Sequence, residues 1–272
     1  MRARLRRALR RPRPDGEADG PPAARKKARL SRRDRPIRTA GRWLAGFVAI
    51  GFGYLTYAYL TLPDIRPLKT SNPTSTAFME LRAREARARG LTPRRIQRWI
   101  SYRQISPDLT RAVLAAEDDA FWNHEGVDFN QLQESLETDW TRGRLVRGGS
   151  TITQQLAKNL YLSPSKDPLR KLLELILARR LEAQLTKARI LELYLNVIEW
   201  GDGLYGVEAA ARTYFHTSAS NVGPSESALL AAAIVNPRVL NPGRPTARLI
   251  RRQQLILRRM GAYSPPVEPV SR

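Results

Sequence analysis

The 272-residue sequence contains no cysteine and only two histidines. Without cysteine the chain forms neither disulfide bonds nor thiolate metal sites, although this absence says little about its compartment. Acidic residues are also scarce, because 25 Asp and Glu stand against 47 Lys and Arg. The formal net charge of +22 is unusual for a soluble enzyme, so the place of this charge along the chain decides its meaning.

Much of the excess positive charge lies at the N-terminus. Residues 1–42 hold 16 basic and four acidic residues, are rich in Arg, Pro and Ala, and show no hydrophobic periodicity. This composition predicts a disordered tail. No nucleic-acid recognition module accompanies the charge, so we do not expect nucleic acid as a partner. A basic tail beside an apolar segment instead favours contact with anionic membrane lipids.

An uncharged stretch of twenty residues, WLAGFVAIGFGYLTYAYLTL, follows at residues 43–62. As a helix it would be about 30 Å long, enough to cross the core of a bilayer. Trp43, Tyr57 and Tyr59 lie towards its ends, as interfacial aromatic residues do. No small-x-small cleavage site follows, so we predict a single uncleaved transmembrane helix. The positive-inside rule then predicts a cytoplasmic tail, an inner (cytoplasmic) membrane anchor and a periplasmic outer domain.

The outer part is predicted to be mainly α-helical. Residues 63–105 should form a juxtamembrane linker, PDIRPLKTSNPTSTAF, and a charged helix that ends at Gly90. Helical periodicity with short Gly, Pro, Asn and Ser breaks dominates residues 106–262, which we expect to form one domain. Residues 263–272 should be a second disordered tail.

The stretch AAEDDAFWNHEG offers a candidate acid–base group. On a helix, Glu117 falls among the apolar residues Val113, Leu114 and Phe121, whereas Asp118 and Asp119 belong to a solvated face. Burial would raise the pKa of Glu117 and make it a usable proton acceptor near neutral pH. A paired structural acid explains the same spacing, so both readings stay open.

A metal site in this stretch would use Asp118, Asp119, His124 and Glu125. His124 lies beyond the helix, however, and no second histidine or carboxylate follows at ligand spacing. A lone histidine in a turn is more typical of a hydrogen-bonding brace. We therefore predict no metal site here.

The stretch RGGSTITQQLAKN predicts a helix N-terminus. Ser150 or Thr151 can cap the helix, and Thr151 with Gln154 matches a capping box. Such an N-terminus, reinforced by Arg147 and Lys158, can bind an anion. Taken alone this signal is weak, because many ordinary helices begin in this way.

A third stretch, KDPLRKLLELILARRLEAQL, predicts a helix that starts at Asp167 and Pro168. Arg170 and Lys171 lie one turn before Glu174, should keep it ionised, and form a cationic patch for phosphate. A functionally silent salt-bridge cluster on the helix surface is the alternative, and the stretch alone favours it.

A fourth stretch, TKARILELYLNVIEWGDGLYG, carries an apolar stripe. Ile190, Leu191, Tyr194 and Leu195 indicate a core helix that serves as scaffold rather than as a site. The three glycines that follow should bend the chain before the next helix.

Together, in this order and spacing, the four stretches resemble the peptidoglycan glycosyltransferases. The matching segments are EDDAFWNHEG, GGSTITQQ, RKLLE and KARILELYLN, and the resemblance covers roughly residues 63–262. The chain is most similar to the monofunctional, membrane-anchored biosynthetic type. Two departures are His216, where relatives usually carry Gly, and the loop TSASNVGPSES.

The resemblance implies a lysozyme-like fold and processive polymerisation of lipid II. Glu117 would be the general base that takes a proton from the 4-hydroxyl of the incoming lipid II. That oxygen attacks the anomeric carbon of the growing glycan, undecaprenyl diphosphate leaves, and the β-1,4 linkage forms with inversion. Glu174 would lie beside the diphosphate and assist its departure. No cofactor is required, although the family leaves room for a divalent cation, Mg²⁺ or Mn²⁺, at the diphosphate.

The resemblance also implies a set of substrate-binding residues and partners. Lipid II, the growing glycan strand and membrane lipids are expected, together with cell-wall synthases or division proteins. The residues expected to bind substrate are Ser150, Thr151, Gln154, Gln155, Lys158, Arg170, Lys171 and His124.

Two other functions remain as alternatives. A lytic enzyme that cleaves the same glycan would share the fold but would not need a second carboxylate in a basic cluster. A membrane-anchored scaffold for cell-wall machinery would tolerate loss of Glu117. The segments SPSK at residues 163–166 and KTS at Lys69 are in the wrong order for a penicillin-binding transpeptidase, so we expect no such activity.

Overall fold

The computed structural model describes residues 34–128, 150–162 and 168–262. The two predicted disordered tails, the glycine break before Ser150 and the SPSK segment lie wholly or mostly outside the described residues. The chain divides into two compact units, Met1–Tyr57 and Ala58–Arg272, which are described separately.

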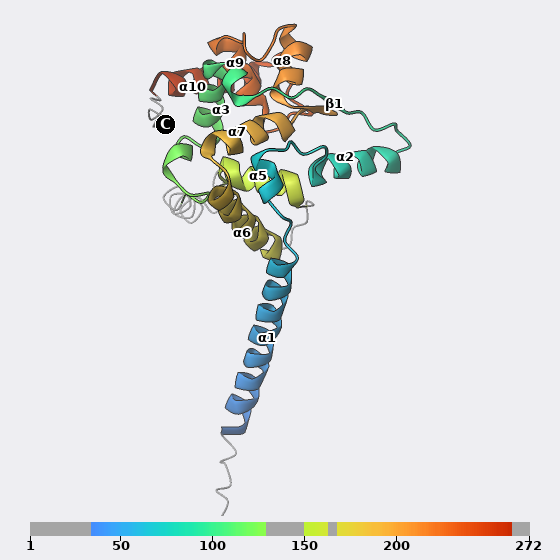
Figure 1. The fold of residues 1–272 in the computed structure, drawn as a ribbon, viewed down its shortest axis with the longest axis vertical. Coiled ribbons are helices and arrows are strands. Elements are labelled where there is room, and N and C mark those ends of the chain that lie inside the picture. The colour runs from blue at the N-terminus through green and yellow to red at the C-terminus, as the bar shows by residue number, and fades with distance from the viewer. Residues whose placement is uncertain (1–33, 129–149, 163–167, 263–272) are drawn as a thin grey trace, which may run out of the picture. The chain divides into compact units, whose positions relative to one another are not determined.

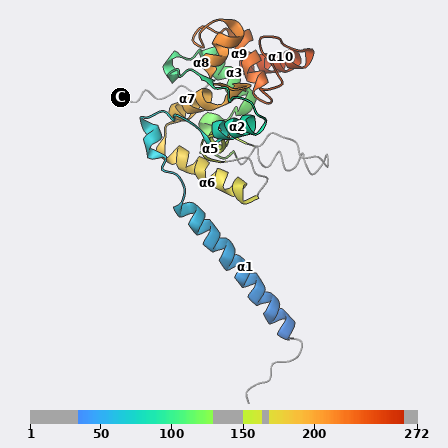
Figure 2. The ribbon, with the colours of Figure 1, turned by 90° about the vertical axis from the view of Figure 1, so that its right-hand side faces the viewer.

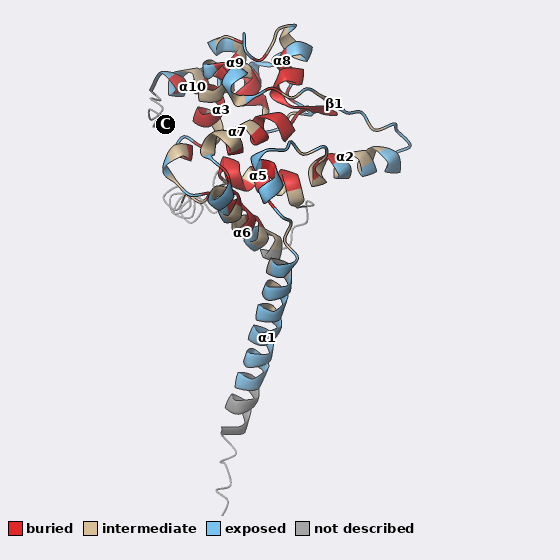
Figure 3. Cartoon of the chain, viewed as in Figure 1, coloured by how far each residue is buried: buried red, intermediate tan, exposed pale blue. Residues whose placement is uncertain are grey.

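The first unit contains most of helix α1 (Asp34–Leu60), which covers nearly all of the predicted apolar helix. Most of its described residues are coloured as exposed in Figure 3, and Trp43, Phe47, Ile50 and Phe52 are 69–72% exposed. In the part of the chain that the structure describes, no helix meets both the length and the hydrophobicity required to cross a bilayer.

The second unit is mainly helical, as predicted (Figure 1). Short 3₁₀ turns, η1 (Arg66–Lys69), η2 (Tyr102–Gln104) and η3 (Phe121–Asn123), connect several of its elements. Its described α-helices are α2 (Ala77–Ala88), α3 (Pro107–Glu117), α5 (Ile152–Tyr161), α6 (Pro168–Gln184), α7 (Lys187–Val197), α8 (Val207–Phe215), α9 (Pro224–Ala233) and α10 (Ala247–Ala262).

Two sets of helices build the core. Helix α3 packs against α9 and α10, and α5 packs against α2, α6 and α7, as Figures 1 and 2 show from two sides. The faces turned towards one another are buried in Figure 3 and carry the apolar stripe of each helix. The largest fully buried side chains include Trp200, Tyr194, Tyr205 and Phe121. The predicted core stripe of α7 is thus confirmed.

A small three-stranded sheet requires glycine at position 203, where two segments of backbone approach closely. Strand β1 (Ile96–Gln97) runs parallel to β3 (Leu204–Tyr205), which pairs antiparallel with β2 (Glu199–Gly201). Gly203 has a φ of 67°, and a Cβ there would lie 2.6 Å from the carbonyl oxygen of Arg94. Only glycine permits both this backbone conformation and this close approach, which confirms the predicted glycine bend.

The segment before α3 joins the core rather than running past it. Helix α2 matches the predicted charged helix, and Gly90 follows it with a φ of 71°. Within the predicted linker, however, the chain forms η1 and buries Ile65 and Leu68 in the core beside Met79. Apolar residues at this spacing were too few to give a periodic signal.

The loop TSASNVGPSES, which departs from the family pattern, is bound by a side chain of α8. Glu208 accepts hydrogen bonds from the Ser218 hydroxyl at 2.9 Å and from the Ala219 N–H at 2.7 Å. Burial raises the pKa of Glu208, but these bonds and Arg212 outweigh it, so that the pKa is lowered on balance. The ionised carboxylate therefore stabilises the loop.

His216, the other departure, ends α8 in the left-handed conformation with a φ of 58°. No other non-glycine residue within the described ranges has a positive φ. A side chain disfavours this conformation, so glycine is the residue that fits this position best.

We expect His216→Gly to stabilise the fold. The left-handed conformation disfavours a side chain by about 1–2 kcal/mol, of which the extra freedom of unfolded glycine offsets a part. The free energy of unfolding should therefore rise by roughly 0.5–1 kcal/mol in urea titrations followed by tryptophan fluorescence. Arg89→Gly, at the end of α2 where φ is −94°, is the matched control and should give no gain. Equal effects of the two changes would contradict the assignment of strain to His216.

Candidate active site

Helix α3 presents Glu117 at its C-terminal end. The helix stops four residues before the predicted Phe121, because Asp118 leaves helical geometry with φ −168° and ψ 81°. The Glu117 side chain is 14% exposed and lies beside the buried Val113 and Leu114. Burial raises the pKa of Glu117 despite the opposing influence of Gln155, Arg252 and Lys158. The predicted apolar placement of this carboxylate is confirmed.

Gln155 on α5 contacts Glu117 directly. Its Nε2 donates a hydrogen bond to Glu117 Oε2 at 2.9 Å, and its Oε1 accepts one from the Tyr194 hydroxyl at 3.0 Å. Arg252 on α10 lies on the other side, with Nη2 3.9 Å from Glu117 Oε1. Three helices other than α3 therefore meet around one carboxylate.

Asp118 corrects the prediction of a solvated face. Its side chain is buried, with the residue only 2% exposed, and accepts hydrogen bonds from His124 Nε2 at 2.9 Å and from the Ile152 N–H at 2.9 Å. The early end of α3 turns Asp118 inwards onto the start of α5. Asp119 remains exposed, as predicted.

His124 braces the loop after α3. The Gly126 N–H donates to His124 Nδ1 at 3.1 Å, so Nε2 carries the hydrogen that bonds to Asp118. Both ring nitrogens thus bind groups of the protein itself, as expected for a brace. The substrate contact assigned to His124 stays a prediction.

The N-terminus of α5 is capped by Thr151, as predicted. The Thr151 hydroxyl accepts from the Gln154 N–H at 3.2 Å and donates to the Gly126 carbonyl at 2.7 Å. The Gln154 side chain does not close the predicted capping box. Its Nε2 instead donates to the Gly126 carbonyl, and its Oε1 accepts from Lys171 at 3.0 Å. Ser150 Oγ accepts from the same ammonium group at 3.2 Å.

Glu174 is buried rather than part of a surface cluster. The residue is 3% exposed and accepts from Lys171 Nζ at 2.5 Å and from Arg170 Nη1 at 3.2 Å. Lys171 also reaches the residues at the start of α5, so this group connects α6 to the capped N-terminus. The predicted ion pairs are present, but the alternative that places Glu174 on the helix surface is wrong, because this carboxylate is buried.

Lys158 on α5 is half-buried, and its positive charge interacts with the carboxylates of both Glu117 and Glu174. Burial lowers its pKa, while the charges of Glu174 and Glu117 oppose this shift. Within the described ranges its ammonium group makes no hydrogen bond or ion pair of its own. A partly desolvated cation of this kind is suited to bind an anionic ligand.

Two contacts near Glu117 were not predicted from the sequence, the one from Tyr194 to Gln155 and the one from Arg252 to Glu117. Tyr194 was read as core, which it is, but its hydroxyl reaches Gln155. Arg252 belongs to the amphipathic basic helix RLIRRQQLILRRM, a signal that could have drawn attention to it. Its Nε is buried and makes no hydrogen bond to the residues that the structure describes.

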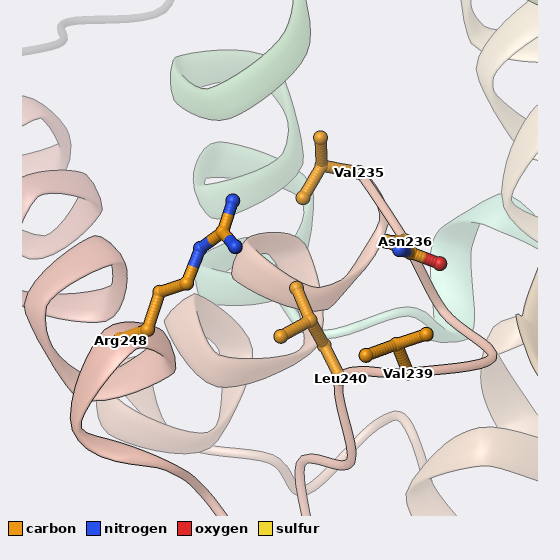
Figure 4. A pocket seen from close by; sticks show the side chains of 5 residues that line it. All are labelled: Val235, Asn236, Val239, Leu240 and Arg248. Atoms are coloured by element: carbon orange, nitrogen blue, oxygen red, sulfur yellow. The ribbon is translucent and has the colours of Figure 1, made fainter.

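Open space adjoins Arg252 along α10. A cavity of about 340 Å³ is lined by Arg252, Leu249 and Leu255 among others. A neighbouring cavity of about 310 Å³ lies between α10 and the segment after α9, where Arg248 faces apolar side chains (Figure 4). The residues that line this second cavity are Val235, Asn236, Val239, Leu240 and Arg248.

Comparison with known proteins agrees with this arrangement. The family model described as Transglycosylase matches residues 85–261. A protein of Nitrosospira multiformis named biosynthetic peptidoglycan transglycosylase is 46% identical over 220 residues, which cover 81% of this chain and 94% of the relative. A protein of Dechloromonas aromatica with the same name is 47% identical over 234 residues, or 85% of this chain and 100% of the relative. The chain therefore belongs to the transglycosylase family, which confirms its resemblance to the peptidoglycan glycosyltransferases.

Proposed function

We propose that the protein is a monofunctional peptidoglycan glycosyltransferase that polymerises lipid II into β-1,4-linked glycan strands. The observation that supports the proposal is a pair of carboxylates in opposite surroundings, the largely buried Glu117 and the buried Glu174. Glu117 is desolvated and its pKa is raised, whereas Glu174 is bound by two cations. This difference suits Glu117 to accept a proton and Glu174 to hold the neighbouring cations in place.

Glu117 acts as the general base in this reaction. The 4-hydroxyl of the incoming lipid II gives its proton to the carboxylate while the oxygen attacks the anomeric carbon of the growing strand. The new carbon–oxygen bond forms as the bond from that carbon to the diphosphate breaks on the opposite face, which gives inversion. The raised pKa brings Glu117 closer to the basicity that proton transfer near neutral pH requires.

The cations around Glu174 suit the leaving group. Lys158, Arg170 and Lys171 can stabilise the negative charge that develops on undecaprenyl diphosphate. The capped N-terminus of α5 adds the hydroxyl of Ser150 and the amide of Gln154, both already within reach of Lys171. This set contains five of the substrate-binding residues expected from the sequence motifs; the contacts expected of Thr151, Gln155 and His124 stay predictions.

The reaction is proposed to need no cofactor. Within residues 34–128, 150–162 and 168–262, no group of three or more His, Asp or Glu side chains could surround a metal ion. Both oxygens of Glu174 are held by Arg170 and Lys171. The described residues therefore offer no preformed three-ligand site for Mg²⁺ or Mn²⁺. A cation held in part by the diphosphate stays a prediction, and we derive no step through such an ion.

We also propose that α1 anchors the protein in the inner (cytoplasmic) membrane, with the N-terminus cytoplasmic and the catalytic domain periplasmic. The exposed apolar side chains along α1 support this, since a lipid-linked substrate requires an enzyme at the bilayer. The basic tail suits anionic lipids. Cell-wall synthases or division proteins are the partners proposed for a protein at this location.

Glu117→Gln should abolish polymer formation. The amide keeps the size of the side chain but cannot accept a proton, so turnover should fall by a factor of about 10²–10⁴. The measurement is polymerisation of labelled lipid II by purified protein, with moenomycin as inhibitor. Glu125→Gln, a matched change of an exposed carboxylate in the same loop, should retain activity. Shortening of preformed glycan by the wild type would instead favour the lytic alternative, and no activity in either direction would favour the scaffold.

The pH dependence of the rate should be bell-shaped. Glu117 must be ionised, so activity falls as pH drops through its raised pKa. Lys158 must be protonated, and because its pKa is lowered, activity falls as pH rises through that value. Lys158→Arg keeps the charge and should move the alkaline limb to higher pH while leaving the acid limb in place. Lys69→Arg is the control, and an unchanged alkaline limb in Lys158→Arg would exclude Lys158 as its source.

Membrane association should depend on α1. The full chain should sediment with membranes and be released by detergent but not by high salt, because apolar burial rather than charge would hold it. A variant that lacks residues 1–60 should be released by high salt. Release of the full chain by salt alone would contradict the anchor.

A further inference from the structure

A chain of two hydrogen bonds connects the core to the Glu117 carboxylate. The Tyr194 hydroxyl on α7 donates to Gln155 Oε1 at 3.0 Å, and Gln155 Nε2 on α5 donates to Glu117 Oε2 at 2.9 Å. The three residues come from three helices, and Tyr194 is fully buried. The general base is thus tied to the protein interior through a single side-chain amide.

The amide can serve this role in only one orientation. A glutamine side chain offers one accepting oxygen and one donating NH₂ group. Tyr194 donates to the oxygen, so the NH₂ group faces Glu117, and the carbonyl of Ser150, 3.4 Å from Nε2, lies on the same side. Burial raises the pKa of Tyr194 well above its ordinary value, so its hydroxyl keeps the proton it donates.

The orientation of Gln155 decides which form of Glu117 is favoured. An NH₂ group at Oε2 stabilises the carboxylate, whereas a rotated amide would place its own oxygen there and favour the protonated acid. Tyr194 opposes that rotation, because its hydroxyl proton would then lose its acceptor. A hydroxyl in the core therefore keeps the base ready to accept a proton.

The second oxygen of Glu117 has no comparable partner. Oε1 makes no hydrogen bond to the described parts of the chain, and Arg252 Nη2 lies 3.9 Å away. Arg252 also lines a cavity of about 340 Å³. Among the described residues, Oε2 therefore accepts a hydrogen bond and Oε1 does not.

We propose that Gln155 and Tyr194 are positioning residues that hold Glu117 through Oε2 and leave Oε1 as the oxygen that accepts the proton. This rests on the proposed role of Glu117 as general base. It also assigns Gln155 to the base rather than to direct substrate binding. Tyr194 thereby gains a role in the reaction in addition to its place in the core.

The charged groups around Glu117 do not depend on this chain of bonds. Arg252 from α10 and Lys158 from α5 favour the ionised form, and Asp118, next in sequence, disfavours it. Tyr194→Phe alters none of these three residues. A change in the titration of Glu117 can then be assigned to the orientation of Gln155.

Tyr194→Phe is the first test. The ring is kept, the hydroxyl is lost, and Gln155 Oε1 loses the hydrogen bond that opposes rotation of the amide. We expect the acid limb of the pH–rate profile to move to higher pH, and turnover at neutral pH to fall about tenfold with KM unchanged. Tyr214→Phe removes a comparable hydroxyl, which bonds to the Trp200 carbonyl at 3.0 Å, and should leave the profile as in the wild type. A wild-type profile in Tyr194→Phe would overturn the proposal.

Gln155→Met gives a second, independent test. It removes the amide at similar size and should move the acid limb in the same direction. Because Tyr194 acts through Gln155, the double variant should behave like Gln155→Met alone, whereas a purely structural role of Tyr194 would make the two effects additive. Additive effects would overturn the proposal even if Tyr194→Phe is poorly folded.

A direct titration separates this proposal from the proposed function. The Glu117 carboxyl carbon can be followed by ¹³C NMR in the full chain, with Glu117→Gln to assign the signal. A titration midpoint raised by Tyr194→Phe but not by Tyr214→Phe supports the positioning role even if lipid II is not polymerised. A midpoint that neither variant changes overturns it even if lipid II is polymerised.

Discussion

The buried carboxylate of Asp118 is the interaction on which the site depends. It accepts from His124 Nε2 on one side and from the first N–H of α5 on the other, so it fixes the end of α3 to the start of α5. Glu117 immediately precedes it, and the capped N-terminus follows from Thr151. A single side chain therefore connects the proposed proton acceptor to the turn proposed to bind the anion, although these groups lie 34 residues apart in sequence.

A second group of contacts, centred on Lys187, supports this junction between α3 and α5. Lys187 at the start of α7 donates to Glu182 of α6 at 2.8 Å and to the carbonyl of His124 at 2.5 Å. Its ammonium group lies 4.4 Å from the centre of the Phe121 ring. Glu182 in turn accepts from Thr153 of α5 at 2.6 Å. Partly buried charges that satisfy one another in this way hold the loop after α3 in one conformation.

The sequence predicts local features well and long-range contacts poorly. Helical periodicity places Glu117 on the apolar face, and capping preferences identify Thr151 and the start of α6. Periodicity does not show that the helix stops at Glu117, so Asp118 is assigned to the wrong face. The bond from Tyr194 to Gln155 spans 39 residues and leaves no local pattern. Arg252 is likewise one arginine among several on α10 until the fold brings it to Glu117.

Glu174 neutralises part of the positive charge around it when no substrate is bound. Without an acid among them, Lys158 on α5 and Arg170 and Lys171 on α6 would attract any phosphate in a protein that already carries +22. Glu174 occupies two of these cations as an internal counter-ion, at 2.5 Å and 3.2 Å. In the proposed reaction, an entering diphosphate competes with this carboxylate, which can recapture the cations when the product departs. Affinity for the leaving group is thereby limited, which suits a catalyst that must release it at every cycle.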